Sequence, residues 1–123
     1  MPIDQNILYE ILAQIALLTD VTTYKNLSKL YMRETGEWYE PHGSWEVPLG
    51  ELNNSLYQLG WPPLSTVVVL NGTCEPGVGY WGSCPNIPTR PRNDLDRITE
   101  YTKILKLVQK APWPPLYPTK SPS

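Results

Sequence analysis

The sequence has no phenylalanine, a single histidine and only two cysteines, Cys74 and Cys84. Two cysteines are too few for a disulfide scaffold, and one histidine beside them argues against a dedicated zinc site. Charged residues make up 18% of the chain and the net charge is −2, which argues against a uniformly basic nucleic-acid-binding protein. No apolar run reaches the roughly 18 residues that a membrane-spanning helix needs. We therefore expect a protein without cofactor or metal.

The N-terminal segment also lacks the marks of a signal peptide. It has no basic start and no small-residue cleavage site, and Asp4 and Glu10 interrupt its apolar run. We expect a cytoplasmic protein with free thiols. Phosphate-binding glycine loops and nucleophile elbows are absent from the sequence, so we expect no enzyme activity. A thiol-dependent enzyme at Cys74 is a distant alternative.

What the chain does contain is tryptophan, tyrosine and proline. Its 123 residues include five Trp, eight Tyr and 14 Pro, and 41% of them are hydrophobic. This length and composition predict one domain with one core. We place that domain at residues 1–110, followed by a Pro-rich tail, 111–123, that is extended or mobile. The word Trp-Pro-Pro-Leu occurs twice, at 61–64 and 113–116, and each Trp is expected to act as a packing anchor.

Apolar spacing of three and four residues predicts four amphipathic helices. Thr23 is the expected N-cap of the second helix and Gly36 its terminator. The expected helices span residues 4–19, 24–35, 48–59 and 94–110. The last helix is expected to bury one apolar set, made of Leu95, Ile98, Tyr101, Leu105 and Val108.

Between the third and fourth helices the pattern changes to β-structure. The β-branched run 65–70 reads as a buried strand, and 80–84 can return as the second strand of a hairpin. Three helices followed by a hairpin and a further helix predict an α+β fold of winged helix-turn-helix type, with the hairpin as the wing.

Part of the chain resembles a known group of proteins. GWPPLSTVVV at 60–69 and PGVGYW at 76–81 resemble the G-L-P-P-L-[ST]-x-L-V-V … P-G-x-G-[FY] stretch of small uncharacterised bacterial and phage-borne proteins. TYKNL at 23–27 is similar to the T-Y-x-x-L helix that precedes it there. The resemblance covers about residues 20–82. It implies a winged-helix-like domain, often linked to mobile elements, with no established activity.

That stretch is in turn loosely similar to the DNA-binding domain of alkylguanine-DNA alkyltransferases. The alkyltransferase nucleophile stands in a Pro-Cys-His-Arg motif, whereas this chain has Gly-Thr-Cys-Glu at 72–75. Alkyl transfer is therefore not carried over to Cys74. Helix 48–59, at the place of a recognition helix, has no cation and contains Glu51, which disfavours specific duplex binding. By analogy of fold, such a scaffold is more often a protein-binding module.

The loop 34–46 combines aromatic and acidic side chains. Exposed, such a cluster is a natural interface, since Trp dominates interface energetics and carboxylates suit a basic groove. If its Trp residues are buried instead, they only cover the edge of the core. The leading hypothesis is an interaction protein, such as a phage-encoded inhibitor of a nucleic-acid-handling or CRISPR-like defence complex in the host cytoplasm. The expected partner-binding residues are Glu34, Glu37, Trp38, Tyr39, Glu40, Trp45 and Glu46.

Charge is uneven along the chain, which supports an alternative. Residues 1–85 hold three basic and nine acidic side chains, whereas 86–123 hold seven basic and three acidic ones. A basic third on an acidic body points to a polyanion or an acidic partner, or to a solvated helix face. The alternative is a nucleic-acid-binding regulator that uses Arg90, Arg92, Arg97, Lys103, Lys106 and Lys110.

Overall fold

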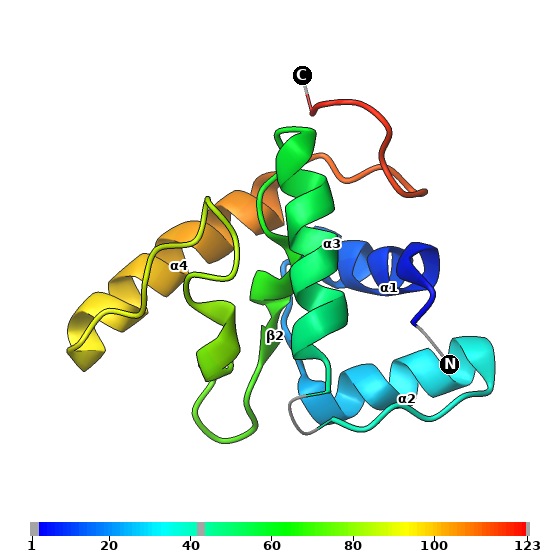
Figure 1. The fold of residues 1–123 in the computed structure, drawn as a ribbon, viewed down its shortest axis with the longest axis horizontal. Helices are drawn as coiled ribbons and strands as arrows, with labels where there is room; N and C mark the ends of the chain where they lie inside the picture. The colour runs from blue at the N-terminus through cyan, green and yellow to red at the C-terminus, as the bar shows by residue number, and fades with distance from the viewer. Residues whose placement is uncertain (1–2, 42–43, 123) are drawn as a thin grey trace.

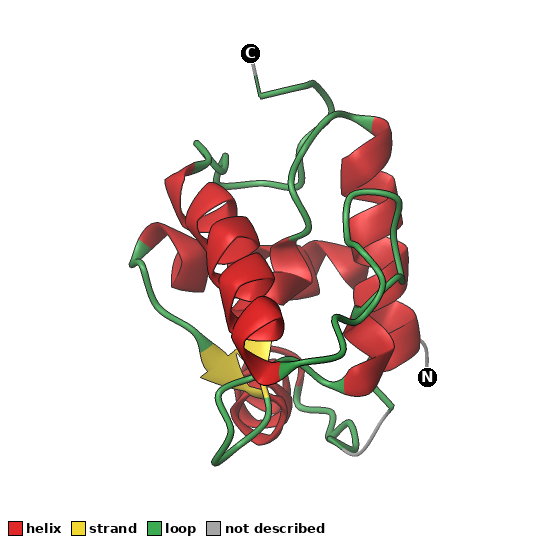
Figure 2. Ribbon diagram, turned by 90° about the vertical axis from the view of Figure 1, so that its left-hand side faces the viewer, coloured by secondary structure: helices red, strands yellow, loops and turns green. Residues whose placement is uncertain are grey.

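The computed structural model describes residues 3–41 and 44–122 (Figure 1). Within these residues the fold has four helices, two very short strands and two 3-10 turns, η1 and η2. Figure 2 shows that helices and loops make up nearly all of the molecule. The elements are α1 (Gln5–Leu17), β1 (Thr22–Thr23), α2 (Tyr24–Thr35), α3 (Glu46–Gln58), η1 (Leu64–Val67), β2 (Val68–Val69), η2 (Val78–Tyr80) and α4 (Asp94–Lys110). The fold is α+β in this coarse sense.

The helix boundaries follow from side-chain caps. The Asp4 carboxylate accepts hydrogen bonds from the first free amides of α1, and the Thr23 hydroxyl accepts one from the amide of Asn26 in α2. Asn93 caps α4 in the same way. Gly36 ends α2 with φ 77°, a left-handed conformation that glycine adopts without a steric penalty. The predicted Thr23 cap and Gly36 terminator are confirmed.

The predicted hairpin is wrong. Of the run 65–70, only β2 is a strand, and it pairs in parallel with β1, Thr22 opposite Val68 and Thr23 opposite Val69. The expected return strand is the turn η2 followed by irregular chain. Backbone donors there are used locally, because the amide of Trp81 bonds to the Val78 carbonyl and that of Gly82 to the Pro88 carbonyl. The described residues therefore contain no β-hairpin wing.

The main core lies where α1, α2, α3, η1 and the C-terminal half of α4 meet. Its side chains are mostly Leu and Val, together with five buried aromatic residues, Tyr9, Tyr31, Trp45, Trp61 and Trp113. Leu12 and Leu52 are fully buried, and so is Trp45. A small second cluster is formed within the segment 80–87 by Tyr80, Cys84 and Ile87, and Trp81 packs against it.

Helix α4 has the predicted bounds but a different buried face. Leu95 and Ile98 are 74% and 56% exposed, and Leu105 is only partly buried, whereas Arg97 is 8% exposed. The reason lies in what the helix packs against. The Tyr101 hydroxyl donates to the Thr66 carbonyl in η1, and this contact fixes the rotation of the helix. The beginning of α4 projects away from the main core (Figure 1), and Leu95 and Ile98 lie there in solvent.

The described part of the C-terminal tail, residues 111–122, has neither helix nor strand, but it is packed. The Trp113 ring stacks on Trp61 with 4.8 Å between ring centroids. Trp113 Nε1 donates to the Val108 carbonyl, and Trp61 Nε1 donates to the Lys120 carbonyl. The Tyr9 hydroxyl donates to the Pro114 carbonyl at 2.7 Å. The two Trp-Pro-Pro-Leu words thus supply two rings of one stack, and both Trp residues are packing anchors.

Candidate functional site

The loop between α2 and α3 runs beside α2 (Figure 1) and is fixed from the inside by two aromatic residues. Trp45 is fully buried, and its Nε1 donates to the Ser28 hydroxyl at 2.9 Å. Tyr39 is partly buried, packs on Trp45 with 4.6 Å between centroids, and donates from its hydroxyl to the Ser44 carbonyl. Of the predicted partner-binding set, Trp45 is therefore a core residue, and its ring is not available to a partner.

Trp38 has the opposite environment. It is 46% exposed, and its Nε1 donates to Glu40 Oε1 at 3.0 Å. Glu34, Glu37 and Glu40 are all exposed, and within the described residues Glu34 makes only a long 3.9 Å contact with Arg33. We call Glu34, Glu37, Trp38 and Glu40 the Trp38 surface. It combines one large aromatic ring with the carboxylate of Glu34 at the end of α2 and those of Glu37 and Glu40 in the loop that follows.

Glu46 lies elsewhere, although the sequence grouped it with this loop. It is the first residue of α3, and its carboxyl group packs over Gly79, where an added Cβ would lie 2.5 Å from the carboxyl carbon. The Tyr24 hydroxyl is close by and accepts a hydrogen bond from the Gly77 amide. Glu46 therefore belongs to the contact between α3 and the segment 77–83.

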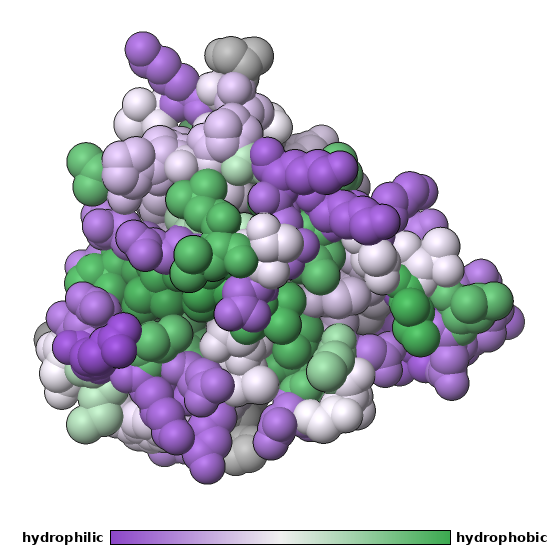
Figure 3. All heavy atoms as spheres, turned by 180° about the vertical axis from the view of Figure 1, so that it is seen from behind, coloured by the Kyte–Doolittle hydropathy of each residue, from purple (hydrophilic) through white to green (hydrophobic). Residues whose placement is uncertain are grey.

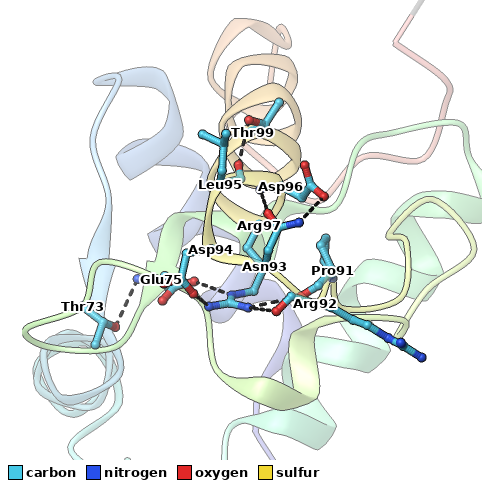
Figure 4. Close-up of polar contacts among 10 residues, drawn as sticks. All are labelled: Thr73, Glu75, Pro91, Arg92, Asn93, Asp94, Leu95, Asp96, Arg97 and Thr99. Carbon is cyan, nitrogen blue, oxygen red and sulfur yellow. Dashed lines mark hydrogen bonds and ion pairs between the residues drawn. The ribbon is translucent and has the colours of Figure 1, made fainter.

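Within the basic C-terminal third, Arg97 forms ion pairs with Glu75 and Asp94, and we call these three residues the Arg97 clasp (Figure 4). Arg97 Nε donates to Glu75 Oε1 at 3.1 Å, and the guanidinium also pairs with Asp94. Its Nη1 donates to the carbonyls of Pro91 and Arg92. The hydrogen bond to Glu75 raises the pKa of Arg97 above its ordinary value. The alternative function assigned Arg97 to nucleic acid, but its guanidinium is already bound by acceptors within the protein.

The other basic residues of the predicted set form two groups, Arg90 and Arg92 before α4, and Lys103, Lys106 and Lys110 on one face of its C-terminal half. In Figure 4 the Arg92 side chain points away from the clasp. Lys103 pairs with Glu100 at 3.7 Å, and the acidic residues Asp94 and Asp96 begin the helix. The 17 residues of α4 span about 26 Å, which separates the cations before the helix from those at its end. The exposed cations of the C-terminal third are Arg90, Arg92, Lys103, Lys106, Lys110 and Lys120.

Nothing among the described residues assembles a thiol or metal centre. Cys74 and Cys84 are both free, and no group of three His, Cys, Asp or Glu side chains within 3–41 and 44–122 could hold a metal ion. Cys84 is buried, burial raises the pKa of its thiol, and its Sγ donates to Asn86 Oδ1. Cys74 is exposed, and the chain's one histidine, His42, lies outside the described residues.

The pairing of Glu75 with Arg97 could not be predicted from the sequence. Glu75 lies 22 residues before Arg97, and no helical or strand periodicity links the two positions. Only the excess of basic residues in the C-terminal third indicated that some of them pair with carboxylates elsewhere in the chain.

No protein-family model, no curated protein and no solved structure matches this chain. No helix among the described residues combines the length and apolar character needed to cross a membrane.

Proposed function

We propose that this protein is a non-catalytic interaction protein that binds a partner protein through the Trp38 surface. The observation that carries the proposal is the contrast within one loop. Trp45 is fully buried, while Trp38 stands 46% exposed among three exposed carboxylates. A half-exposed Trp that the core does not need is the kind of side chain that anchors an interface.

The side-chain contacts of Tyr39 and Trp45 support the proposal. The Tyr39–Trp45 ring contact and the two side-chain hydrogen bonds beneath it hold these two residues against the core. Side chains that are already held in place lose less conformational entropy on binding. The bond from Trp38 Nε1 to Glu40 also orients the ring.

The negative charge of the Trp38 surface indicates what kind of partner it favours. Three carboxylates around an aromatic ring favour a partner groove lined by Arg and Lys. Such grooves hold phosphates in proteins that handle nucleic acids, and carboxylates seated there compete with the phosphates. The function we propose is therefore inhibition of a nucleic-acid-handling complex, for example a CRISPR-like defence complex. The resemblance of residues 20–82 to phage-borne proteins supports the same reading.

The alternative, a nucleic-acid-binding regulator, has weaker support. Arg97 is engaged by Glu75, Asp94 and two carbonyls, and Lys103 faces Glu100. Arg90 and Arg92, before α4, are separated along the helix from Lys106 and Lys110 in its second half.

Affinity capture tests the proposal. The wild-type chain is immobilised, and proteins retained from the lysate of a candidate host are compared with those retained by Trp38→Ala and by Glu37→Lys/Glu40→Lys. Val78→Ala is the matched control, since Val78 is 71% exposed far along the chain from this loop. We expect a nucleic-acid-binding protein that the wild type and the control retain and both site variants lose.

Direct binding to nucleic acid separates the two functions. Fluorescence anisotropy with single-stranded and duplex DNA and with RNA is measured over a range of salt concentrations. Salt-dependent binding that Arg90→Glu/Arg92→Glu abolishes supports the regulator and contradicts our proposal.

A further inference from the structure

The loop between β2 and η2 contains the one Asn-Gly pair of the sequence, Asn71-Gly72. Both residues are exposed and lie in a turn, and Figure 1 shows this loop at the lower edge of the molecule. Figure 3 views the molecule from behind. The lower edge there is mostly hydrophilic or of intermediate hydropathy and lies outside the large hydrophobic patch on that face. Water therefore reaches the Asn71 side chain.

The backbone amide of Gly72 is unhindered. Apart from its own chain neighbours, nothing lies within 4 Å of the place where a Cβ on Gly72 would be. Its φ of 94° is a conformation that glycine adopts without a steric penalty. Among the described residues, no hydrogen bond holds the Gly72 amide or the Asn71 side chain. The two groups can therefore move toward each other without breaking a contact.

We propose that Asn71 is a self-modification site, whose side-chain amide is lost in the folded protein without an enzyme. The Gly72 nitrogen attacks the side-chain carbonyl carbon of Asn71, and the bond from that carbon to Nδ2 breaks. Nδ2 leaves as ammonia with the proton of the Gly72 amide, and a cyclic imide remains. Water then opens the imide at either of its two carbonyls, giving aspartate or isoaspartate. The sequence needs no oxidant or reductant.

The asparagines of α3 provide the contrast. Asn54 is exposed, but its Nδ2 donates to the Gly50 carbonyl at 3.0 Å. Asn53 is buried and bonded to Ser65. The amide that follows each of them belongs to the hydrogen-bonded backbone of the helix, so it cannot approach the side-chain carbonyl. Asn54 therefore serves as an internal reference for an exposed asparagine that the fold protects.

The position of Asn71 gives its modification a structural consequence. The loop is closed by the Leu70 amide, which donates to the Glu75 carbonyl at 2.7 Å, and by the Cys74 amide, which donates to the Leu70 carbonyl at 3.3 Å. Isoaspartate at position 71 lengthens the main chain of this closed loop by one methylene. Since Glu75 also accepts from Arg97, the modification loosens the Arg97 clasp between the loop and α4. The fraction of molecules with a weakened clasp then rises with the age of the protein. This inference is independent of the Trp38 surface.

Peptide mapping by mass spectrometry tests the site. The full-length protein is incubated at mildly alkaline pH, once folded and once unfolded in urea, and the rates of amide loss at Asn71 and Asn54 are compared. In the folded protein we expect Asn71 to convert at least tenfold faster than Asn54, and at a rate close to its own rate in urea. An Asn71 that converts in urea but stays intact in the folded protein overturns the proposal, as do equal rates at the two residues in the folded protein.

Calorimetry of fresh and incubated protein tests the consequence. Incubation is expected to lower the melting temperature of the wild type but not that of Asn71→Gln, whose longer side chain does not close the five-membered imide. Fresh Asn71→Asp has the added charge with a normal main chain, and is expected to melt like the fresh wild type. Arg97→Met, whose clasp is already broken, should lose less on incubation. A fully converted wild type with an unchanged melting temperature contradicts the effect on the clasp.

Discussion

Two tryptophans seven residues apart show how strongly position decides a side chain's role. Trp45 is held by the Ser28 hydroxyl and by two neighbouring rings, Tyr31 and Tyr39. Trp38 has a carboxylate as its hydrogen-bond partner and almost half of its surface in solvent. The two residues are identical in type, but only one belongs to the core.

Truncation of these two residues therefore has different consequences for stability. We predict that Trp45→Ala lowers the free energy of unfolding by about 3–5 kcal/mol, because it removes a fully buried ring. Trp38→Ala changes it by no more than about 0.5 kcal/mol, as expected for a surface substitution. Urea denaturation of both variants measures the difference. Equal losses in the two variants would disprove this division of roles.

Arg97 is the second residue whose role is structural. It connects the first turn of α4 to Glu75 in the loop after β2 and to the carbonyls before the helix. We predict that Arg97→Met lowers the melting temperature, because Glu75 and the two carbonyls lose their donor together. Arg90→Met, at an exposed position, leaves it unchanged. Differential scanning calorimetry of the pair checks this, and an unchanged melting temperature in Arg97→Met would refute it.

At the scale of elements, local signals in the sequence were sufficient for the helices. The Thr23 cap and the Gly36 terminator act within one turn, and so could be read from neighbouring residues. The hairpin prediction was wrong because strand pairing depends on contacts between residues far apart in the sequence. β2 pairs with β1, whose residues lie 46 positions earlier in the sequence. The backbone amides of the segment 78–82 form hydrogen bonds in local turns instead.

The faces of elements were harder to predict than their bounds. The bounds of α4 are those predicted, yet Leu95 and Ile98 lie in solvent and Arg97 is buried. Apolar spacing cannot show that a helix extends beyond the core, or that an acidic residue 22 positions earlier will bury an arginine. In the acidic loop, the cluster was visible in the sequence, but which Trp faced outward was not.

The tail is the element whose contribution to stability is least evident from its composition. Trp113 is 4% exposed and contacts both Trp61 and Tyr9. We predict that Trp113→Ala costs about 3–5 kcal/mol in unfolding free energy. Leu116→Ala, where the side chain is 68% exposed, costs less than about 0.5 kcal/mol. Chemical denaturation compares them, and a Trp113→Ala variant as stable as Leu116→Ala would show that the tail contributes little.

At the scale of the whole molecule, buried tyrosines make the fold sensitive to alkali. Burial raises the pKa of Tyr9, Tyr80 and Tyr101 well above the ordinary value of 10.0. The fold thus favours the protonated phenols, whose hydroxyls bond to Pro114, Thr66 and the Thr66 carbonyl. Their contribution is complete below pH 10 and is lost as the pH rises above it toward the raised folded values.

We accordingly predict that the melting temperature falls steadily between about pH 9.5 and pH 11.5. Tyrosinate absorbance should appear late for these residues and rise sharply when the protein unfolds. Tyr101→Phe should flatten part of the pH dependence, since it removes one of the titrating groups. A melting temperature that stays constant or increases over this interval would rule out the protonated, buried phenols.

The central claim is our proposal that the Trp38 surface is the face of the molecule that binds a partner. The most direct measurement of that claim is the dissociation constant of the captured partner, compared by titration calorimetry for the wild type, Trp38→Ala and the control Val78→Ala. We predict at least a tenfold weaker affinity for Trp38→Ala, about 1.4 kcal/mol, with the control unchanged. Equal affinity of Trp38→Ala and the wild type would contradict the proposed interface.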